Sequence, residues 1–403
     1  MRSFAIQYVA RLTMGNMDEA SRFEDLPPGG RFSRQEMISG WSQDRLSAAR
    51  ILVVGAGAIG NETLKNLALL GVGTVGIIDL DRVEESNLSR CVLFRAKDIG
   101  CLKAEVASEM LRQLHPSIHI QTYPCDLLTG IGAGVVEEYD LVLGCLDSIE
   151  ARWQLNKLAR QAGVSWIDAG VNSFHGQIAL YHPEEGACYE CGLSDNMLAY
   201  INERHSCSGA PRETAPAAVP VAATIVSLTA SLQVHEAVRY LISDAKDTGH
   251  WPGLAPGERL SLSLAPYELF VVRSRINPLC MAHGERYEKK EPLGMGYRNT
   301  VSDVLQAVGC NLMELDWDIV TGLRCDHCGT QEVVFPLWQL APEHQRCLRC
   351  GAACFAERTS RIEVRDAVAL LPLETFGVPP GAYIRTSGDQ GEFLIKLDAS
   401  YGS

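Results

Sequence analysis

The stretch Ile51-Leu-Val-Val-Gly-Ala-Gly-Ala-Ile-Gly60 decides the fold of this 403-residue chain. Its first four residues form a short apolar run, which is typical of a buried strand. Gly55, Gly57 and Gly60 follow at once and lead into a helical stretch from Asn61 to Leu70. Glycines at this spacing let the backbone approach a phosphate closely, and the N-terminus of the helix offers amide N–H groups to it. The stretch therefore predicts a nucleotide-binding strand, turn and helix.

Two further apolar runs repeat this pattern downstream. Val75 to Ile78 ends in Asp79, and Leu141 to Leu143 ends near Asp147. Apolar runs that alternate with amphipathic stretches indicate βαβ units and a sheet with both faces covered. Residues 224–242 then predict one long amphipathic helix, with Ile225, Leu228, Leu232, Val238 and Leu241 near one face. The expected fold class is α/β, a Rossmann-like mixed sheet with helices on both faces.

The pattern of apolar runs and predicted elements changes after residue 285. Residues 300–310 predict a helix, a cysteine-rich segment follows, and the end of the chain predicts a β-hairpin. Its strands are expected at Phe376 to Arg385 and at Glu392 to Leu397. We therefore expect an N-terminal tail over residues 1–30, a nucleotide-binding domain over 31–284, and a smaller C-terminal α+β domain over 285–403.

Composition excludes several classes of protein. Apolar residues make up 46% of the chain and charged residues 21%, an ordinary globular balance. The formal net charge of −13 argues against a nucleic-acid partner for the whole chain. No apolar stretch reaches the roughly 20 residues that a membrane-spanning helix needs. We expect a cytoplasmic protein whose 14 cysteines serve as metal ligands, buried thiols or a nucleophile rather than as disulfides.

The residues that follow the glycine turn distinguish two kinds of nucleotide site. Asp79 could bond a ribose hydroxyl, and with the glycines alone it would equally favour an NAD-dependent oxidoreductase. A triphosphate concentrates more negative charge than a dinucleotide and needs cations near its α-phosphate. Arg90 and Lys103 could supply that charge, and Asp147 could hold Mg²⁺ at the carboxyl end of a strand. The sequence therefore favours ATP over NAD.

Five segments in this order resemble the ubiquitin-activating superfamily, which includes the HesA/MoeB/ThiF adenylyltransferases. They begin at Arg31 (RFSRQ), Gly55 (GAGAIG), Asp79 (DLDRVEESNLSR), Gly100 (GCLK) and Cys145 (CLDS). The resemblance covers roughly residues 31–284 and implies that this part is a ThiF-type adenylation domain. It also implies a target: the C-terminal carboxylate of a small ubiquitin-like or sulfur-carrier protein.

The resemblance also implies roles for single residues. Asp79 and Asp81 would lie in the nucleotide site, with Asp79 on the ribose. The phosphates would be contacted by Asn87, Arg90 and Lys103, and Asp147 would hold Mg²⁺. Arg34 would act as an arginine finger that reaches across from the other subunit of a homodimer. The chain departs from the family pattern at Cys91 and Ser148, where the family usually has glutamine and asparagine.

Two pairs of ligand residues predict a structural zinc site. Cys188 and Cys191 are separated by two residues, as are Cys280 and His283. This spacing lets two side chains converge on one tetrahedral ion, and three cysteines with one histidine are an ordinary zinc set. The superfamily often carries two CxxC pairs at these places, so His283 replaces the last cysteine.

A second zinc site is predicted within residues 325–354. Cys325 and Cys328 precede Cys347 and Cys350, and 18 residues separate the pairs, which is typical of a zinc ribbon. Many ribbons bind nucleic acid, but this segment carries no excess of basic residues. A structural or protein-docking ribbon is the better interpretation, and we expect two zinc ions in all.

Cys207 is the candidate nucleophile. It lies in the polar loop Glu203-Arg-His-Ser-Cys207, where Arg204 and His205 could lower the pKa of its thiol. In the superfamily a reactive cysteine often occupies this loop. A thiolate here could take the acyl group from an acyl-adenylate as a thioester and pass it to a conjugating enzyme.

Three alternatives stay open at this point. The chain could adenylate a sulfur carrier or a peptide without forming a thioester, although no rhodanese-like cysteine loop follows. It could be an NAD-dependent oxidoreductase, or a binding protein that has kept the fold and lost catalysis. Arg90, Lys103 and Asp147 argue against the last two.

Overall fold

The computed structural model describes residues 29–199, 201, 220–242, 252–284, 288–290, 294–389 and 391–399. Its larger sheet has eight strands in the order β3-β2-β1-β4-β5-β6-β7-β8, in which β1 to β5 run parallel and β6 to β8 antiparallel. The strands are β1 (Arg50–Val54), β2 (Thr74–Ile78), β3 (His119–Tyr123), β4 (Leu141–Gly144), β5 (Trp166–Asn172), β6 (His175–Tyr181), β7 (Glu258–Leu264) and β8 (Tyr267–Arg273).

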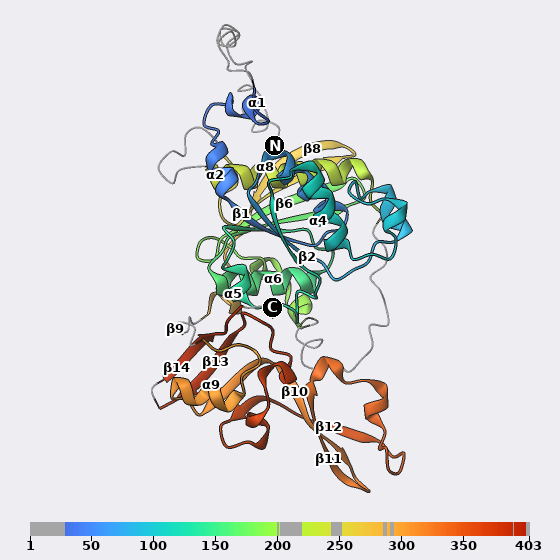
Figure 1. The fold of residues 1–403 in the computed structure, drawn as a ribbon, viewed down its shortest axis with the longest axis vertical. Helices are drawn as coiled ribbons and strands as arrows, with labels where there is room; N and C mark the ends of the chain where they lie inside the picture. Colours follow the sequence, from blue (N-terminus) through green and yellow to red (C-terminus); the bar gives the residue numbers. More distant parts are fainter. Residues whose placement is uncertain are drawn as a thin grey trace, which may run out of the picture.

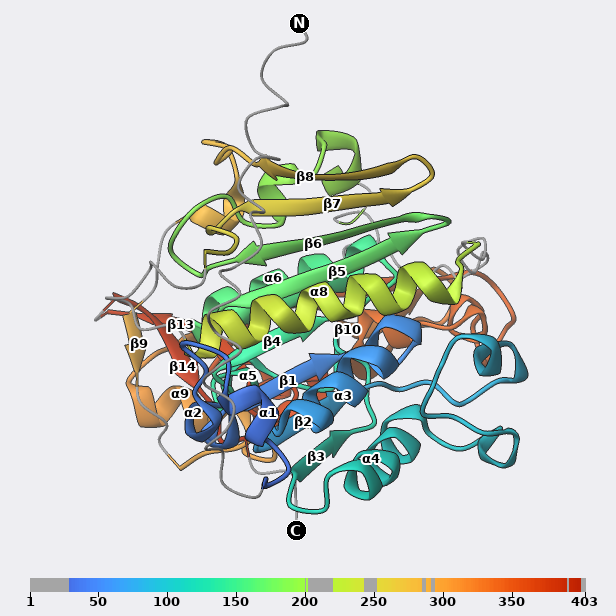
Figure 2. The same cartoon turned by 90° about the horizontal axis from the view of Figure 1, so that it is seen from above.

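Helices cover both faces of this sheet, so the predicted α/β fold is confirmed. Three helices lie on one face, and Figure 2 shows them in front of the strands: α3 (Ala58–Leu70), α4 (Lys103–Leu114) and α8 (Ala223–Ile242). The opposite face is covered by α5 (Ala133–Val136) and α6 (Ile149–Ala162). The strands at the centre are buried on both sides, which explains why their sequences read as continuous apolar runs.

The buried face of the long helix α8 matches the predicted one only in part. Ile225 and Val238 are buried as expected, but the side chain of Leu228 is 41% exposed. The buried stripe instead includes Thr229 and Gln233, and Gln233 donates hydrogen bonds to the carbonyl oxygens of Gly144 and Ile167. A satisfied amide can thus occupy a core position that a purely apolar count assigns to leucine.

The second sheet is antiparallel except at one edge and has the order β11-β10-β13-β14-β9, with β12 also paired to β10. Its strands are β9 (Glu288–Lys290), β10 (Leu312–Cys325), β11 (Gly329–Pro336), β12 (Cys354–Glu363), β13 (Tyr383–Gly388) and β14 (Gly391–Lys396). Helix α9 (Val301–Val308) begins at a capping box between Thr300 and Asp303, and it packs its apolar face on this sheet.

The terminal hairpin is confirmed as β13 and β14, but its first strand starts later than predicted. Phe376 ends a short 3₁₀ helix, and Gly377 follows in the left-handed conformation with φ 77°. Pro379 and Pro380 cannot donate to a strand ladder, so pairing begins only at Tyr383.

Polar contacts join the second sheet to α5 and α6, which lie between the two sheets in Figure 1. The carboxylate of Glu137 accepts hydrogen bonds from Tyr383 and from Lys396, the latter at 2.5 Å. Lys157 on α6 forms an ion pair of 2.8 Å with Asp316 on β10. Helix α6 therefore contacts the second sheet directly.

Candidate functional site

The candidate site lies where the strand order of the larger sheet reverses. β1 lies between β2 and β4, so the connections after β1 and β4 leave the sheet in opposite directions. In sheets of this kind such a reversal produces a crevice at the carboxyl ends of the two strands. The glycine turn follows β1, and the segment from Cys145 to Asp147 follows β4. The crevice is the place where this class of sheet binds its ligands.

Two of the three glycines are required by the geometry of the turn. Gly55 has φ 96°, which side chains disfavour. A Cβ on Gly60 would overlap the carbonyl oxygen of Gly55, because the first turn of α3 packs tightly under the loop. Helix α3 begins at Ala58, and its N-cap residue Gly57 provides no side-chain cap, so the first N–H groups of the helix can bind an anion.

Asp79 braces this turn from the end of β2. Its carboxylate accepts hydrogen bonds from the backbone N–H groups of Ala56 at 2.7 Å and Asp81 at 2.8 Å. Burial raises the pKa of Asp79, although both N–H groups and the charge of Lys103 oppose that shift. The sequence prediction placed this carboxylate correctly beside the turn, and its role toward a ribose stays a prediction.

Lys103 is the first residue of α4 and lies next to Asp79 and Asp81. Its ammonium group forms an ion pair of 2.9 Å with Asp81 while the residue is only 9% exposed. Burial works to lower the pKa of Lys103, but the hydrogen bond to Asp81 and the charge of Asp79 outweigh it, and the pKa is raised. The side chain is therefore held charged at the edge of the crevice.

Arg90 and Asn87 lie on a long loop between β2 and α4. The base of the loop is closed by the isolated bridge between Arg82 and Leu102. Arg90 donates to the carbonyl oxygen of Ser86 at 2.6 Å, and the side chain of Asn87 accepts from the N–H of Glu84 at 2.9 Å. Both side chains are thus used within the loop, and their contacts with phosphate stay predictions.

The two departures from the family pattern have structural explanations. Cys91 is 4% exposed and packs in the main hydrophobic cluster, and burial raises the pKa of its thiol to about 11. Ser148 caps the N-terminus of α6, where its hydroxyl accepts from the N–H of Ala151 at 3.1 Å. Asp147 stands exposed immediately before that cap, where its carboxylate is accessible to a hydrated Mg²⁺.

Arg34 does not lie with the other predicted residues within one chain. It belongs to the short helix α1 (Ser33–Glu36), and the neighbouring ring of Phe32 packs against Gly71 and His115. Gly71 ends α3, and the 13 residues of α3 span roughly 20 Å from the glycine turn. The exposed Arg34 is therefore anchored at the far end of that helix.

Two residues near the crevice were missed by the sequence analysis. Asn61 is fully buried and bonds both the glycine turn and the loop that carries Arg90. Arg152 pairs with the buried Asp168 at 2.8 Å and donates to the carbonyl oxygen of Leu146, next to Asp147. A polar residue on the buried face of a predicted helix is the signal that could have identified Asn61, because it precedes Leu64 by one turn.

Two of the thiols not assigned to metal lie in the segments that the sequence analysis connected with the site. Cys145 follows β4 and is buried, which raises the pKa of its thiol to about 12 and makes it unreactive. Cys207, the predicted nucleophile, lies outside the described residues.

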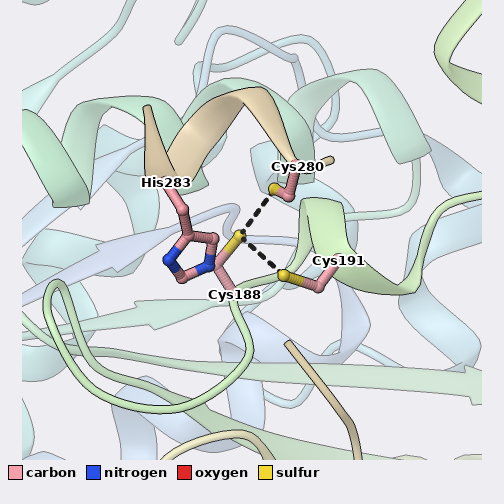
Figure 3. Close-up of side chains that lie close together, drawn as sticks. All are labelled: Cys188, Cys191, Cys280 and His283. Carbon is pink, nitrogen blue, oxygen red and sulfur yellow. Dashed lines mark hydrogen bonds between the residues drawn. The ribbon is translucent and has the colours of Figure 1, made fainter. Parts of the chain in front are cut away.

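Cys188, Cys191, Cys280 and His283 come together as predicted, and Figure 3 shows their side chains converging. The Sγ atom of Cys188 lies 3.8 Å from that of Cys191 and 3.7 Å from that of Cys280. Sulfurs bound tetrahedrally at about 2.3 Å from zinc would lie about 3.8 Å apart, so the geometry fits zinc. Between the first two cysteines, Glu190 accepts from the indole N–H of Trp153 at 2.8 Å and so ties the cluster to α6.

The second cluster comprises Cys325, Cys328, Cys347 and Cys350. The Sγ atoms of Cys325 and Cys350 lie 3.6 Å apart, again close to the tetrahedral spacing. Backbone N–H groups of Arg349 and Cys350 lower the pKa of Cys347 to about 6, which favours the thiolate that a metal needs. The cluster lies where β10, β11 and β12 end, and it is more exposed than the first.

The sheet order, the glycine turn and the charged crevice together define a Rossmann-like nucleotide-binding protein. The family model described as "ThiF family" matches residues 32–264, more than half of the chain. The chain therefore belongs to the ThiF family, which confirms the resemblance inferred from the five motifs.

Individual relatives agree with this assignment. The chain is 31% identical over 261 residues to a sulfur carrier protein adenylyltransferase of Thermus thermophilus, covering 62% of this chain and 87% of that protein. It is 37% identical to an adenylyltransferase and sulfurtransferase, UBA4, of Meyerozyma guilliermondii, covering 44% of this chain and 42% of the relative, which is less than half of its length. The crystal structure of MccB from E. coli matches with a TM-score of 0.51 at 22% identity, covering 64% of this chain and 75% of that one, and so supports the fold.

No helix among the described residues is both long enough and apolar enough to cross a membrane.

Proposed function

We propose that this chain uses ATP to adenylate the C-terminal carboxylate of a ubiquitin-like or sulfur-carrier protein. The observation that carries the proposal is the buried, charged Lys103, held beside Asp79 and Asp81 at the rim of the glycine turn. A carboxylate oxygen of the carrier attacks the α-phosphorus, the bond from that phosphorus to the bridging oxygen breaks, and pyrophosphate leaves. The name of the Thermus relative supports a sulfur carrier as the substrate class.

The chain's own residues supply the charge that this step needs. The free N–H groups at the start of α3 face the phosphates, and Lys103 and Arg90 offset the charge that develops on them. Asp147 would hold Mg²⁺, whose charge also offsets that of the phosphates. Asp79 would contact the ribose through the acceptor positions of its carboxylate that the backbone N–H groups of Ala56 and Asp81 do not use.

We propose that Cys207 receives the acyl group in a second step. Its thiolate attacks the acyl carbon of the adenylate, the bond to the phosphate oxygen breaks, and AMP leaves. The thioester could then serve a conjugating enzyme or a sulfur donor. The alternative is adenylation without a thioester, and the names of the sulfur-carrier and sulfurtransferase relatives are compatible with it.

The experiment that tests both steps measures ATP–pyrophosphate exchange with candidate carrier proteins that end in Gly-Gly. Lys103→Ala should lower the exchange rate by a factor that corresponds to about 2–4 kcal/mol, because a preorganised positive charge is removed from the phosphates. Cys207→Ala should retain exchange and lose a thiol-sensitive adduct of the carrier. Unchanged exchange in Lys103→Ala would remove this residue from the mechanism, and an adduct that persists in Cys207→Ala would exclude Cys207 as acceptor.

We propose further that the active form is a homodimer in which Arg34 completes the crevice of the other subunit. Within one chain Arg34 is held at the far end of α3, where it cannot reach its own glycine turn. The edge strand β8 offers an apolar surface that a second copy could cover, since Tyr267 is 86% exposed and Leu269 65% exposed.

The domain division and the metals complete the proposal. The buried residues of the hydrophobic clusters on the larger sheet all precede residue 284, and those of the clusters on the second sheet all follow residue 285, which supports a ThiF-type domain over residues 31–284 and a second domain over 285–403. We assign one structural zinc ion to each cysteine cluster, in which Cys188, Cys191, Cys280 and His283 hold one ion and Cys325, Cys328, Cys347 and Cys350 hold the other.

A further inference from the structure

Asn61 connects two segments that are far apart in the sequence. Its side-chain amide nitrogen donates to the carbonyl oxygens of Ala56 at 2.7 Å and Gly57 at 3.2 Å, both in the glycine turn. Its side-chain oxygen accepts from the backbone N–H of Leu93 at 2.9 Å. The residue is fully buried, so its polar atoms are used by these bonds alone among the contacts described.

The two connected segments carry the two halves of the proposed phosphate site. The glycine turn and the start of α3 provide the N–H groups, and the loop from β2 to α4 provides Arg90, three residues before Leu93. The base of the loop is fixed by the bridge between Arg82 and Leu102, which is remote in sequence from Arg90. The middle of the loop needs its own attachment to the turn, and the bond from Leu93 to Asn61 provides one.

From this geometry we infer that Asn61 is a positioning residue for Arg90. It sets the distance between the arginine and the N–H groups of the turn, so that both can engage one nucleotide. The inference rests on the proposed function, because it names the residue that assembles that same site. The two ends of the Asn61 side chain have different tasks. Its amide oxygen must accept from the N–H of Leu93, and its amide nitrogen must donate to the carbonyl oxygens of the turn, which an asparagine side chain can do at once.

The inference predicts that substitutions at Asn61 and Arg90 are not independent. Asn61→Ala leaves the buried N–H of Leu93 without an acceptor, so the loop shifts and Arg90 no longer meets the phosphates. We expect Asn61→Ala to weaken the binding of ATP with Mg²⁺ by about tenfold in the wild-type background. In the Arg90→Ala background the same substitution should weaken binding by less than about twofold, because there is no arginine left to misplace.

Asn156→Ala provides a matched control for the loss of a buried asparagine. Asn156 is also buried on a helix, and its side-chain oxygen also accepts a backbone N–H, from Tyr189 at 3.2 Å, but it faces the first cysteine cluster. The effect of Asn156→Ala on ATP binding should be the same in the wild-type and the Arg90→Ala backgrounds, whatever its size. Asn61→Ser, which leaves a smaller cavity, repeats the test if Asn61→Ala folds poorly.

The measurement is titration calorimetry of the full chain with ATP and Mg²⁺, with thermal unfolding as the check on folding. An effect of Asn61→Ala or Asn61→Ser that is equally large in both backgrounds would overturn the inference and leave Asn61 as a structural residue, with the proposed function intact. No binding of ATP by the wild type would instead overturn the proposed function, and this inference with it.

Discussion

At the scale of single residues, Cys145 makes the stability of the protein depend on pH. The thiol is buried beneath the crevice, where it lies 3.5 Å from the side-chain oxygen of Gln233, and burial raises its pKa from 9.0 to about 12. The native state therefore favours the neutral thiol more strongly than the unfolded state does. The resulting stabilisation is fully present below pH 9 and is lost as the pH rises through the folded pKa near 12.

Cys145→Ser removes this titration, because a serine hydroxyl does not ionise in that range. We expect the unfolding free energy of the wild type to fall relative to that of the variant above pH 9, by at most about 1.4 kcal/mol per pH unit. Urea unfolding of both proteins between pH 7 and pH 11 measures the difference. Curves that stay parallel across this range would show that the thiol does not ionise on unfolding.

The sequence identified the residues whose positions follow from a local pattern. Gly55 and Asp79 were placed correctly because each ends or follows a strand, and parallel strands bring their carboxyl ends together. Asn61 could not be assigned its role, because its partner Leu93 lies on a loop whose path no periodicity predicts. The contact of Arg152 with Leu146, next to Asp147, could not be predicted either, because Leu146 also lies on a loop.

At the scale of elements, the two cysteine clusters differ in how they are covered. In the first, Cys188 is 3% and Cys280 7% exposed, and Trp153 and Arg160 on α6 bond the turns that carry them. In the second, Cys350 is exposed and lies in the turn that precedes β12. A chelator reaches an ion through its exposed ligands, so the second cluster should lose its zinc first.

We expect about two zinc ions per chain to be released to a chromophoric chelator in two phases, in line with the two ligand sets. Cys350→Ser should remove the fast phase and leave the slow one, and Cys280→Ser should do the reverse. Absorbance of the zinc–chelator complex over time measures both. Release of a single equivalent in one phase by the wild type would contradict the assignment of two sites.

The elements themselves were predictable where hydrophobic period and turn residues agree. The runs at 51–54, 75–78 and 141–143 are strands within one residue of their predicted bounds. The start of the terminal hairpin was wrong because Gly377 bends the chain before Pro379, and strand propensity alone does not register that bend. The buried face of α8 was predicted only in part, since Leu228 is exposed and Gln233 instead satisfies its amide inside the core.

At the scale of the whole molecule, the sequence does not predict how the two sheets meet. The contacts between Glu137 and Lys396 and between Lys157 and Asp316 join residues that are far apart in the chain. Asp316 also bonds Arg385, and although burial alone would raise its pKa, these two cations lower it. Such charge pairs depend on the final packing of the two sheets, and no local sequence motif predicts them.

The proposed exchange of Arg34 between subunits leads to the last prediction. Arg34→Ala and Lys103→Ala should each abolish most adenylation, because each removes a cation from every crevice of a symmetric dimer. After the two inactive variants are mixed and allowed to exchange subunits, about half of the dimers are mixed, and each of these has one crevice with both cations intact. ATP–pyrophosphate exchange should therefore return to about a quarter of the wild-type rate.

Leu269→Arg on β8 supplies the matched test of the surface that joins the subunits. A charge on this exposed edge should convert dimers to monomers, as measured by light scattering, and should prevent the recovery of activity in the mixture. Activity that does not return on mixing, while both variants remain folded and exchange subunits, would exclude the placement of Arg34 in the crevice of the other subunit. Recovery by mixing is hard to obtain in any other way, because neither chain alone carries a complete set of cations.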